Sequence, residues 1–64
     1  MYKVTGTYFD EAEQAEHFEY QATDMEGCLS VCRSLTRLYG PVEATISENG
    51  RHITDWPQLT LVRS

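Results

Sequence analysis

Two cysteines and two histidines are the residues of this 64-residue chain that could together hold a metal ion. Cys28 and Cys32 are one helical turn apart, so both thiolates could bind one zinc ion, and His17 and His52 could complete the ligand set. Both cysteines also fall where a helix would pack small residues into a core. We therefore expect two buried, free thiols with no metal and no other cofactor, and helical geometry disfavours a disulfide between them.

The sequence contains none of the common catalytic motifs. The chain has no Gly-x-Ser-x-Gly, no His-Glu-x-x-His, no glycine-rich phosphate loop and no Cys–His pair at a familiar spacing. A domain of this length buries only about 60% of the surface that its unfolded chain exposes, which leaves little space for a deep cleft. We expect no catalytic residues, and a protein that is not an enzyme and acts by binding.

Acidic residues are concentrated in one segment. Residues 10–26 contain seven carboxylates and no lysine or arginine, in a chain of formal net charge −5. The segment can be explained by solubility and helix capping, or by a negative patch that steers the protein to a basic protein surface, such as that of a nucleic-acid-binding complex. The predicted partner-binding carboxylates are Asp10, Glu11, Glu13, Glu16 and Glu19. The negative charge argues against direct binding to nucleic acid or to an anionic membrane.

Alternation of apolar and polar residues predicts a first β-hairpin. Strands are expected over residues 2–9 and 16–22, with Val4 and Phe18 on the core face and His17 on the outer face. The connection over residues 10–15 can be a hairpin loop or a helical turn.

A helix follows the first hairpin. Thr23 and Glu26 are spaced as a capping box, in which Thr23 caps the amide of Glu26 and the Glu26 side chain reaches back. Apolar residues then recur at helical spacing, Gly27 in the first turn would allow close approach to the sheet, and Gly40 before a proline marks the end.

A second hairpin is indicated by Asn49-Gly50, the signature of a two-residue type I′ turn. That turn predicts Ile46 opposite Ile53 in the core and Trp56 on the outer face, opposite Glu43. Trp56 is therefore the sixth predicted partner-binding residue, because tryptophan is enriched at interface centres. The alternative is that the C-terminal segment covers it, with residues 58–63 forming a fifth strand or a packed tail.

These elements predict one α+β domain over residues 1–64, ordered ββαββ, with a mostly antiparallel sheet and one helix on one face. We expect a soluble, cytoplasmic protein, since the N-terminus lacks the apolar run of a signal peptide and no segment could span a bilayer. In length, acidity and layout the chain resembles small phage-encoded inhibitors of host machinery, which include anti-CRISPR proteins and RNA polymerase inhibitors. This resemblance is based on no motif and implies no particular functional residue.

Two functions follow from these observations. The first is a small acidic protein-binding module, of phage or mobile-element type, that inhibits a host machine handling nucleic acid. The alternative is a homo-oligomeric structural module, such as a homodimer, that associates through an edge strand and the outer face of the sheet.

Overall fold

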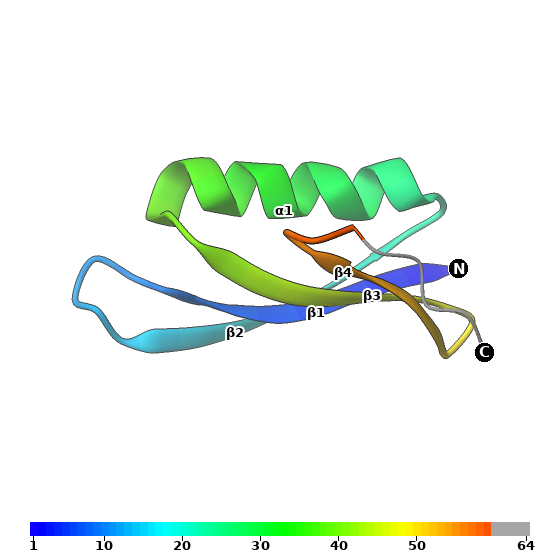
Figure 1. Ribbon diagram of the computed structural model, residues 1–64, viewed down its shortest axis with the longest axis horizontal. Coiled ribbons are helices and arrows are strands. Elements are labelled where there is room, and N and C mark those ends of the chain that lie inside the picture. The colour runs from blue at the N-terminus through cyan, green and yellow to red at the C-terminus, as the bar shows by residue number, and fades with distance from the viewer. Residues whose placement is uncertain (60–64) are drawn as a thin grey trace.

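The computed structural model describes residues 1–59, which fold as a β-hairpin, a helix and a second β-hairpin. The elements are β1 (Tyr2–Phe9), β2 (Ala15–Ala22), α1 (Met25–Tyr39), β3 (Val42–Glu48) and β4 (Arg51–Trp56). In this part of the chain the strands form one antiparallel sheet in the order β2-β1-β3-β4, and α1 covers one face of it (Figure 1). The predicted α+β class and ββαββ order are confirmed.

β1 is an inner strand that pairs with both β2 and β3 in regular register. Val4 lies opposite Tyr20 on one side and opposite Ile46 on the other. The predicted faces of the first hairpin are confirmed, because Val4 is fully buried and Phe18 packs against the same core while His17 is exposed. The two hairpins meet along β1 and β3, so β2 and β4 are the edge strands.

The core lies between α1 and the sheet and is made of small and medium side chains. Its buried apolar residues are Val4, Cys28, Cys32, Val42, Ala44 and Ile46. Both cysteines are free and completely buried, which confirms their predicted place on the apolar stripe of the helix. Partly buried apolar residues, most of them larger, pack against this core: Tyr2, Phe18, Ala22, Leu29, Ile53 and Trp56.

Two glycines allow unusually close contacts around this core. A Cβ atom on Gly27 would lie 2.7 Å from the Cβ of Ala22, so the first turn of α1 can cross the end of β2 only because residue 27 lacks a side chain. A Cβ atom on Gly6 would lie 2.7 Å from the Cβ of Ala44. The expected close approach of the helix at Gly27 is confirmed, and Gly6 does the same between β1 and β3.

The N-terminus of α1 differs from the predicted capping box. Asp24 is the N-cap instead of Thr23, and its Oδ1 accepts a hydrogen bond from the Gly27 amide at 2.9 Å. The Glu26 carboxylate does not reach back, because it accepts a hydrogen bond from Arg33 Nη2 at 2.7 Å. The predicted N-cap, Thr23, is therefore wrong by one residue. Thr23 belongs to the bend that leaves β2, and aspartate is at least as good an N-cap as threonine.

The predicted turn and stop signals are confirmed. Gly40 ends α1 with φ 94°, and its amide donates to the Thr36 carbonyl at 2.9 Å. Asn49 and Gly50 have φ 51° and 85°, the two positive values that a type I′ turn requires.

The β3–β4 register follows from the two-residue turn at Glu48–Arg51 and Ser47–His52 and then shifts. A bulge lies between Ser47 and Ile46, and beyond it Ile46 is opposite Thr54 instead of Ile53. The predicted Ile46–Ile53 pair is therefore wrong. Thr54 is buried at this position, while Ile53 packs at the margin of the core.

The C-terminal prediction is only partly covered by the structure. Gln58 and Leu59 lie beyond the end of β4 and are exposed, whereas residues 60–63 of the predicted fifth strand or tail lie outside the described residues. Among the residues that are described, no helix has the length and apolarity needed to cross a lipid bilayer.

Candidate functional site

The connection between β1 and β2 is a tight hairpin turn organised by Asp10. The Asp10 carboxylate accepts hydrogen bonds from the amides of Ala12 and Gln14, each at 2.9 Å. The Asp10 amide donates to the Gln14 carbonyl at 3.0 Å, and the Asp10 carbonyl accepts from the Glu13 amide at 2.9 Å. The segment is therefore a hairpin loop and not a helical turn. Asp10 has a structural role in it, because its carboxylate satisfies backbone amides.

The other predicted carboxylates lie along the same hairpin. The turn projects beyond the C-terminal end of α1, so Glu11 and Glu13 lie at one extreme of the molecule (Figure 1). Glu16 follows at the start of β2, opposite Tyr8 on the helix side of the sheet. Glu19 lies farther along β2 and belongs to the outer face. The structure thus brings Glu11, Glu13 and Glu16 to one end and separates Glu19 from them.

The acidic residues of the segment differ in what their carboxylates contact. Glu19 lies 3.5 Å from the Lys3 ammonium, and the two carboxylates at the start of α1 are used by the N-cap and the ion pair described above. Within residues 1–59 three exposed carboxylates of the segment make no ion pair and no side-chain hydrogen bond: Glu11, Glu13 and Glu16. We name these three the acidic end, and no cationic side chain within residues 1–59 forms an ion pair with them.

Apolar side chains are exposed at the same end of the molecule. The rings of Tyr8 and Tyr39 stack with centroids 4.6 Å apart, which ties the end of α1 to the hairpin. Partial burial raises the pKa of Tyr8, and Tyr39 raises it further. Phe9, next to the turn, is 59% exposed, and Leu38 in the last helical turn is 70% exposed. These residues were not among the predicted site residues, although Phe9 belongs to the outer face by alternation and Leu38 lies at the side of the apolar stripe.

Trp56 lies on the opposite face from the predicted one. The bulge in β4 places it opposite Ala44, on the side of the helix, where it packs against the core. Its indole N–H donates to the Thr36 hydroxyl at 3.3 Å, and that hydroxyl donates to the Cys32 carbonyl at 2.8 Å. The predicted outer face is wrong because an unbulged strand would turn Asp55 toward the core. That unfavourable burial of a carboxylate was a signal in the sequence for the bulge.

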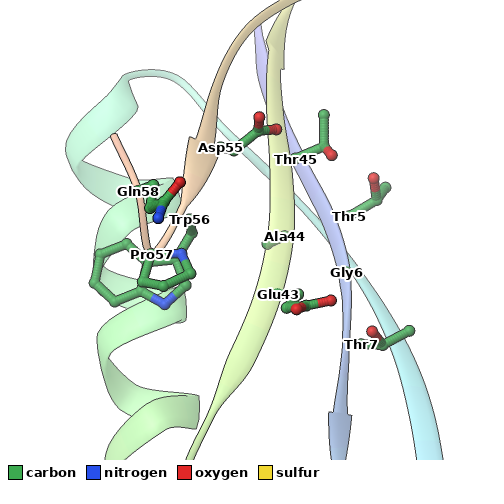
Figure 2. Close-up of a pocket in the computed structure, with 10 residues that line it drawn as sticks. All are labelled: Thr5, Gly6, Thr7, Glu43, Ala44, Thr45, Asp55, Trp56, Pro57 and Gln58. Carbon is green, nitrogen blue, oxygen red and sulfur yellow. The ribbon is translucent and has the colours of Figure 1, made fainter. Parts of the chain in front are cut away.

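The outer face of the sheet is open in the described part of the chain and is rich in threonine. Thr5, Thr7 and Thr45 point away from α1, with Glu43 and Asp55 beside them, while Trp56 and Pro57 lie toward the helix (Figure 2). These residues border a shallow hollow of about 620 Å³ near the end of β4. Its described lining offers hydroxyl and carboxylate oxygens and no cationic side chain, so it does not suit an anionic ligand.

A histidine–aspartate pair lies on the same face. His52 Nε2 and Asp55 Oδ1 are 2.8 Å apart, and both side chains are substantially exposed. Ser47 lies opposite His52, yet its hydroxyl donates to the Lys3 carbonyl at 3.5 Å, so these side chains do not form a Ser-His-Asp relay. His17 is exposed on this face, as predicted. That the protein is not an enzyme stays a prediction.

Burial determines the chemistry of the two thiols. It raises the pKa of Cys32 to about 11 and also raises the pKa of Cys28. A thiol that stays protonated at neutral pH is a weak nucleophile and a weak metal ligand. Among residues 1–59 no group of three or more histidine, cysteine, aspartate or glutamate side chains is arranged to hold a metal ion.

Comparison with known proteins gives no further guide to function, since no family model, no curated protein and no solved structure matches this chain.

Proposed function

We propose that this protein is a small acidic protein-binding module that docks on a basic surface of a partner protein through the acidic end of its first hairpin. The observation that carries the proposal is the position of Glu11, Glu13 and Glu16. These carboxylates are exposed at a projecting end of the fold and lack internal partners among residues 1–59. Charges of one sign in such a position attract a complementary surface and accelerate encounter with it.

The apolar side chains at the same end supply the contact that charge alone does not. Phe9 and Leu38 are mostly exposed, and Tyr39 is partly exposed while it stacks on Tyr8. Affinity at protein interfaces is concentrated in a few desolvated, mostly aromatic side chains, with charges acting mainly on the association rate. In this proposal Phe9 takes the role of anchor that the sequence assigned to Trp56, whose indole N–H already has a hydrogen-bond acceptor within the fold.

The partner proposed is a machine that handles nucleic acid, and the activity proposed is inhibition of that machine by a phage or mobile-element protein. Such machines present basic surfaces to the phosphate backbone, and an acidic module can occupy the same surface. The support for this class of partner is the sign and exposure of the charge together with the layout of the chain.

Self-association stays the alternative, and a specific feature favours it: the outer face of the sheet is uncovered in the described part of the chain. Sedimentation at increasing protein concentration tests this alternative. A protein that sediments as a monomer at high concentration would exclude it.

The experiment compares two triple variants that change the net charge equally. One neutralises the acidic end, E11Q/E13Q/E16Q, and the other neutralises the three acidic residues outside segment 10–26, E43Q/E48Q/D55N. A partner captured from host lysate by the tagged wild-type protein is purified, and association and dissociation rates are measured for all three proteins at low and high salt. Circular dichroism checks that each variant is folded.

The proposal expects the acidic-end variant to associate about tenfold more slowly than wild type at low salt, with a smaller change in dissociation. The other variant should associate at close to the wild-type rate. Equal rates for the two variants, or binding that is independent of salt, would contradict a role for the acidic end.

A further inference from the structure

The two edges of the sheet are protected very differently. β4 is six residues long, carries a bulge and is followed by Pro57, all features that discourage the addition of another strand. β2 is eight residues long and pairs with β1 residue for residue, without a bulge. It contains no proline and no lysine, two of the residues with which proteins block an exposed edge, and its charged side chains are the carboxylates Glu16 and Glu19.

The outer edge of β2 offers backbone hydrogen-bonding groups to an incoming chain. Within residues 1–59, β2 pairs with β1 and with no other strand. In an antiparallel pair the N–H and C=O groups of alternate residues point away from the neighbouring strand. The groups along Ala15–Ala22 that point away from β1 therefore have no strand partner in the described structure, and they form a template for one more strand.

An apolar groove runs beside this edge, between β2 and α1. Phe18 and Tyr20 line it from the strand and Val31 and Leu35 from the helix, around a volume of about 330 Å³. Tyr20 is 46% exposed, and Leu38, which continues the row of Val31 and Leu35 along the helix, is 70% exposed. A strand added to β2 would point every second side chain toward this groove.

We propose that β2 binds its partner by strand addition, taking up an extended segment of the partner in which apolar and basic residues alternate. The apolar side chains enter the groove between β2 and α1, and the basic ones lie over the outer face beside Glu19. This inference rests on the proposed function and specifies the partner's form, a basic strand. Main-chain hydrogen bonds along the edge provide affinity, and the groove selects side chains of suitable size.

The negative charge around β2 favours a basic strand over a second copy of this chain as the occupant of the edge. β2 carries Glu16 and Glu19, and carboxylates flank it at both ends, in the turn before it and at the start of α1. A second β2 would bring another segment of seven carboxylates alongside the first, and like charges in adjacent strands are destabilising. Lysine or arginine side chains on the outer side of the incoming strand would instead lie beside Glu19 and within the negative potential of the carboxylates at both ends of β2.

The test uses a synthetic octapeptide of alternating valine and lysine as the probe. Three matched peptides accompany it: one with alternate backbone amides N-methylated, one with glutamate in place of lysine, and one with the same composition in scrambled order. Titrations are followed by NMR, and amide hydrogen exchange is measured residue by residue in the free and bound protein.

Two protein variants of equal charge locate the binding site. Val31→Lys places an ammonium group in the groove, whereas Thr45→Lys places the same charge on the outer face of the sheet, away from the groove. The Val31→Lys variant should weaken binding of the alternating peptide about tenfold, and Thr45→Lys should leave it close to wild type. Both variants are checked for wild-type folding before titration.

If the alternating peptide adds to β2 as a strand, the β2 amides should exchange more slowly in the complex. The N-methylated and scrambled peptides should then bind about tenfold more weakly than the alternating peptide. Equal binding of the alternating, N-methylated and scrambled peptides, with shifts confined to residues 10–16, would overturn strand addition and leave the proposed function intact. If none of the basic peptides binds, strand addition is wrong. The role of the acidic end is tested separately, by the association rates of the triple variants with the purified partner. Concentration-dependent dimerisation that Val31→Lys abolishes would assign the groove to a second copy instead.

Discussion

Cys28 and Cys32 show how position alters the chemistry of a residue type. Their spacing on a helix is compatible with metal binding, but both side chains are completely buried against β1 and β3. Burial favours the neutral thiol and raises both pKa values, so the two sulfur atoms fill space in the core.

This burial predicts a loss of stability at alkaline pH. In the unfolded chain a cysteine thiol ionises near its ordinary pKa of 9.0, whereas folded Cys32 holds its proton until about pH 11. The unfolded state therefore releases protons first, and the free energy of unfolding should fall as pH rises from about 9 to 11. Urea denaturation at several pH values across this range measures the effect.

The double variant Cys28→Ala/Cys32→Ala is the control. It should be about 1–2 kcal/mol less stable than wild type below pH 9, because two sulfur atoms leave the core. Its stability should then depend less on pH, with the remaining slope due to tyrosines such as Tyr2 and Tyr8, whose pKa values are also raised. Equal slopes for the two proteins would show that the thiols are not buried in solution.

Trp56 stabilises this fold by packing its ring against the core. Removal of the side chain in Trp56→Ala should cost about 2–4 kcal/mol, because the ring packs against the core. Trp56→Phe should cost only about 1–2 kcal/mol, since it keeps most of the packing and loses the hydrogen bond to Thr36. Denaturant unfolding of both variants checks this order, and wild-type stability of Trp56→Ala would contradict the inward position.

Among the elements, the β3–β4 hairpin depends most directly on backbone conformation at one residue. Gly50 has φ 85°, and a side chain there would meet no atom within 4 Å, so any cost of substitution arises from the backbone. Gly50→Val should destabilise the protein by about 2 kcal/mol, because β-branched residues resist positive φ. Thermal unfolding measures the change.

A d-alanine at position 50 of chemically synthesised protein is the control for this prediction. It adds a methyl group but favours positive φ, so it should be tolerated or slightly stabilising. If both substitutions were equally destabilising, steric conflict and not backbone conformation would be responsible.

The bulge in β4 is the feature of the second hairpin that the sequence pattern did not predict. The Asn49-Gly50 turn determines the pairs nearest to it, Glu48 with Arg51 and Ser47 with His52. Farther along, a single extra residue reverses which face each side chain takes, and the sheet gains burial of Trp56 and exposure of Asp55 in exchange for one disrupted pair. Alternation alone did not predict this exchange. The inward Asp55 of the unbulged register was a sign against that register, but the benefit of an inward Trp56 comes from α1 lying over the strand.

At the scale of the whole molecule, the distribution of charge affects folding as well as binding. The formal net charge is −5, and the acidic end adds three carboxylates without internal partners among residues 1–59. The E11Q/E13Q/E16Q variant should be more stable than wild type at low salt, by roughly 0.5 kcal/mol or about 2–4 °C in Tm, because like charges repel.

High salt should remove that gain, since exposed charges are screened over about 8 Å at physiological ionic strength and over less at higher salt. The E43Q/E48Q/D55N variant should show a smaller gain, because it weakens the Asp55–His52 contact by removing the carboxylate charge while its net charge changes equally. Calorimetry of the three proteins at two salt concentrations checks both statements. A gain that persists at high salt would point to a cause other than charge repulsion.

The sequence by itself determined the class of fold, the faces of the first hairpin, the apolar stripe of the helix and both glycine-dependent signals at Gly40 and Gly50. These features depend on neighbours a few residues apart, through strand alternation, helical periodicity and backbone conformation. The acidity of residues 10–26 is likewise visible in the chain, although its three unpartnered carboxylates are not.

Only the tertiary structure decided the strand order, the inward position of Trp56 and which carboxylates remain free of partners. The order β2-β1-β3-β4 leaves β2 at an edge beside an apolar groove, and nothing local to Ala15–Ala22 indicates that. Local sequence also does not distinguish Glu16 from Glu19, three residues later, although only Glu19 forms an ion pair with a lysine. The physical reason is that pairing and burial depend on contacts between residues far apart in sequence, which pack together only in the complete fold.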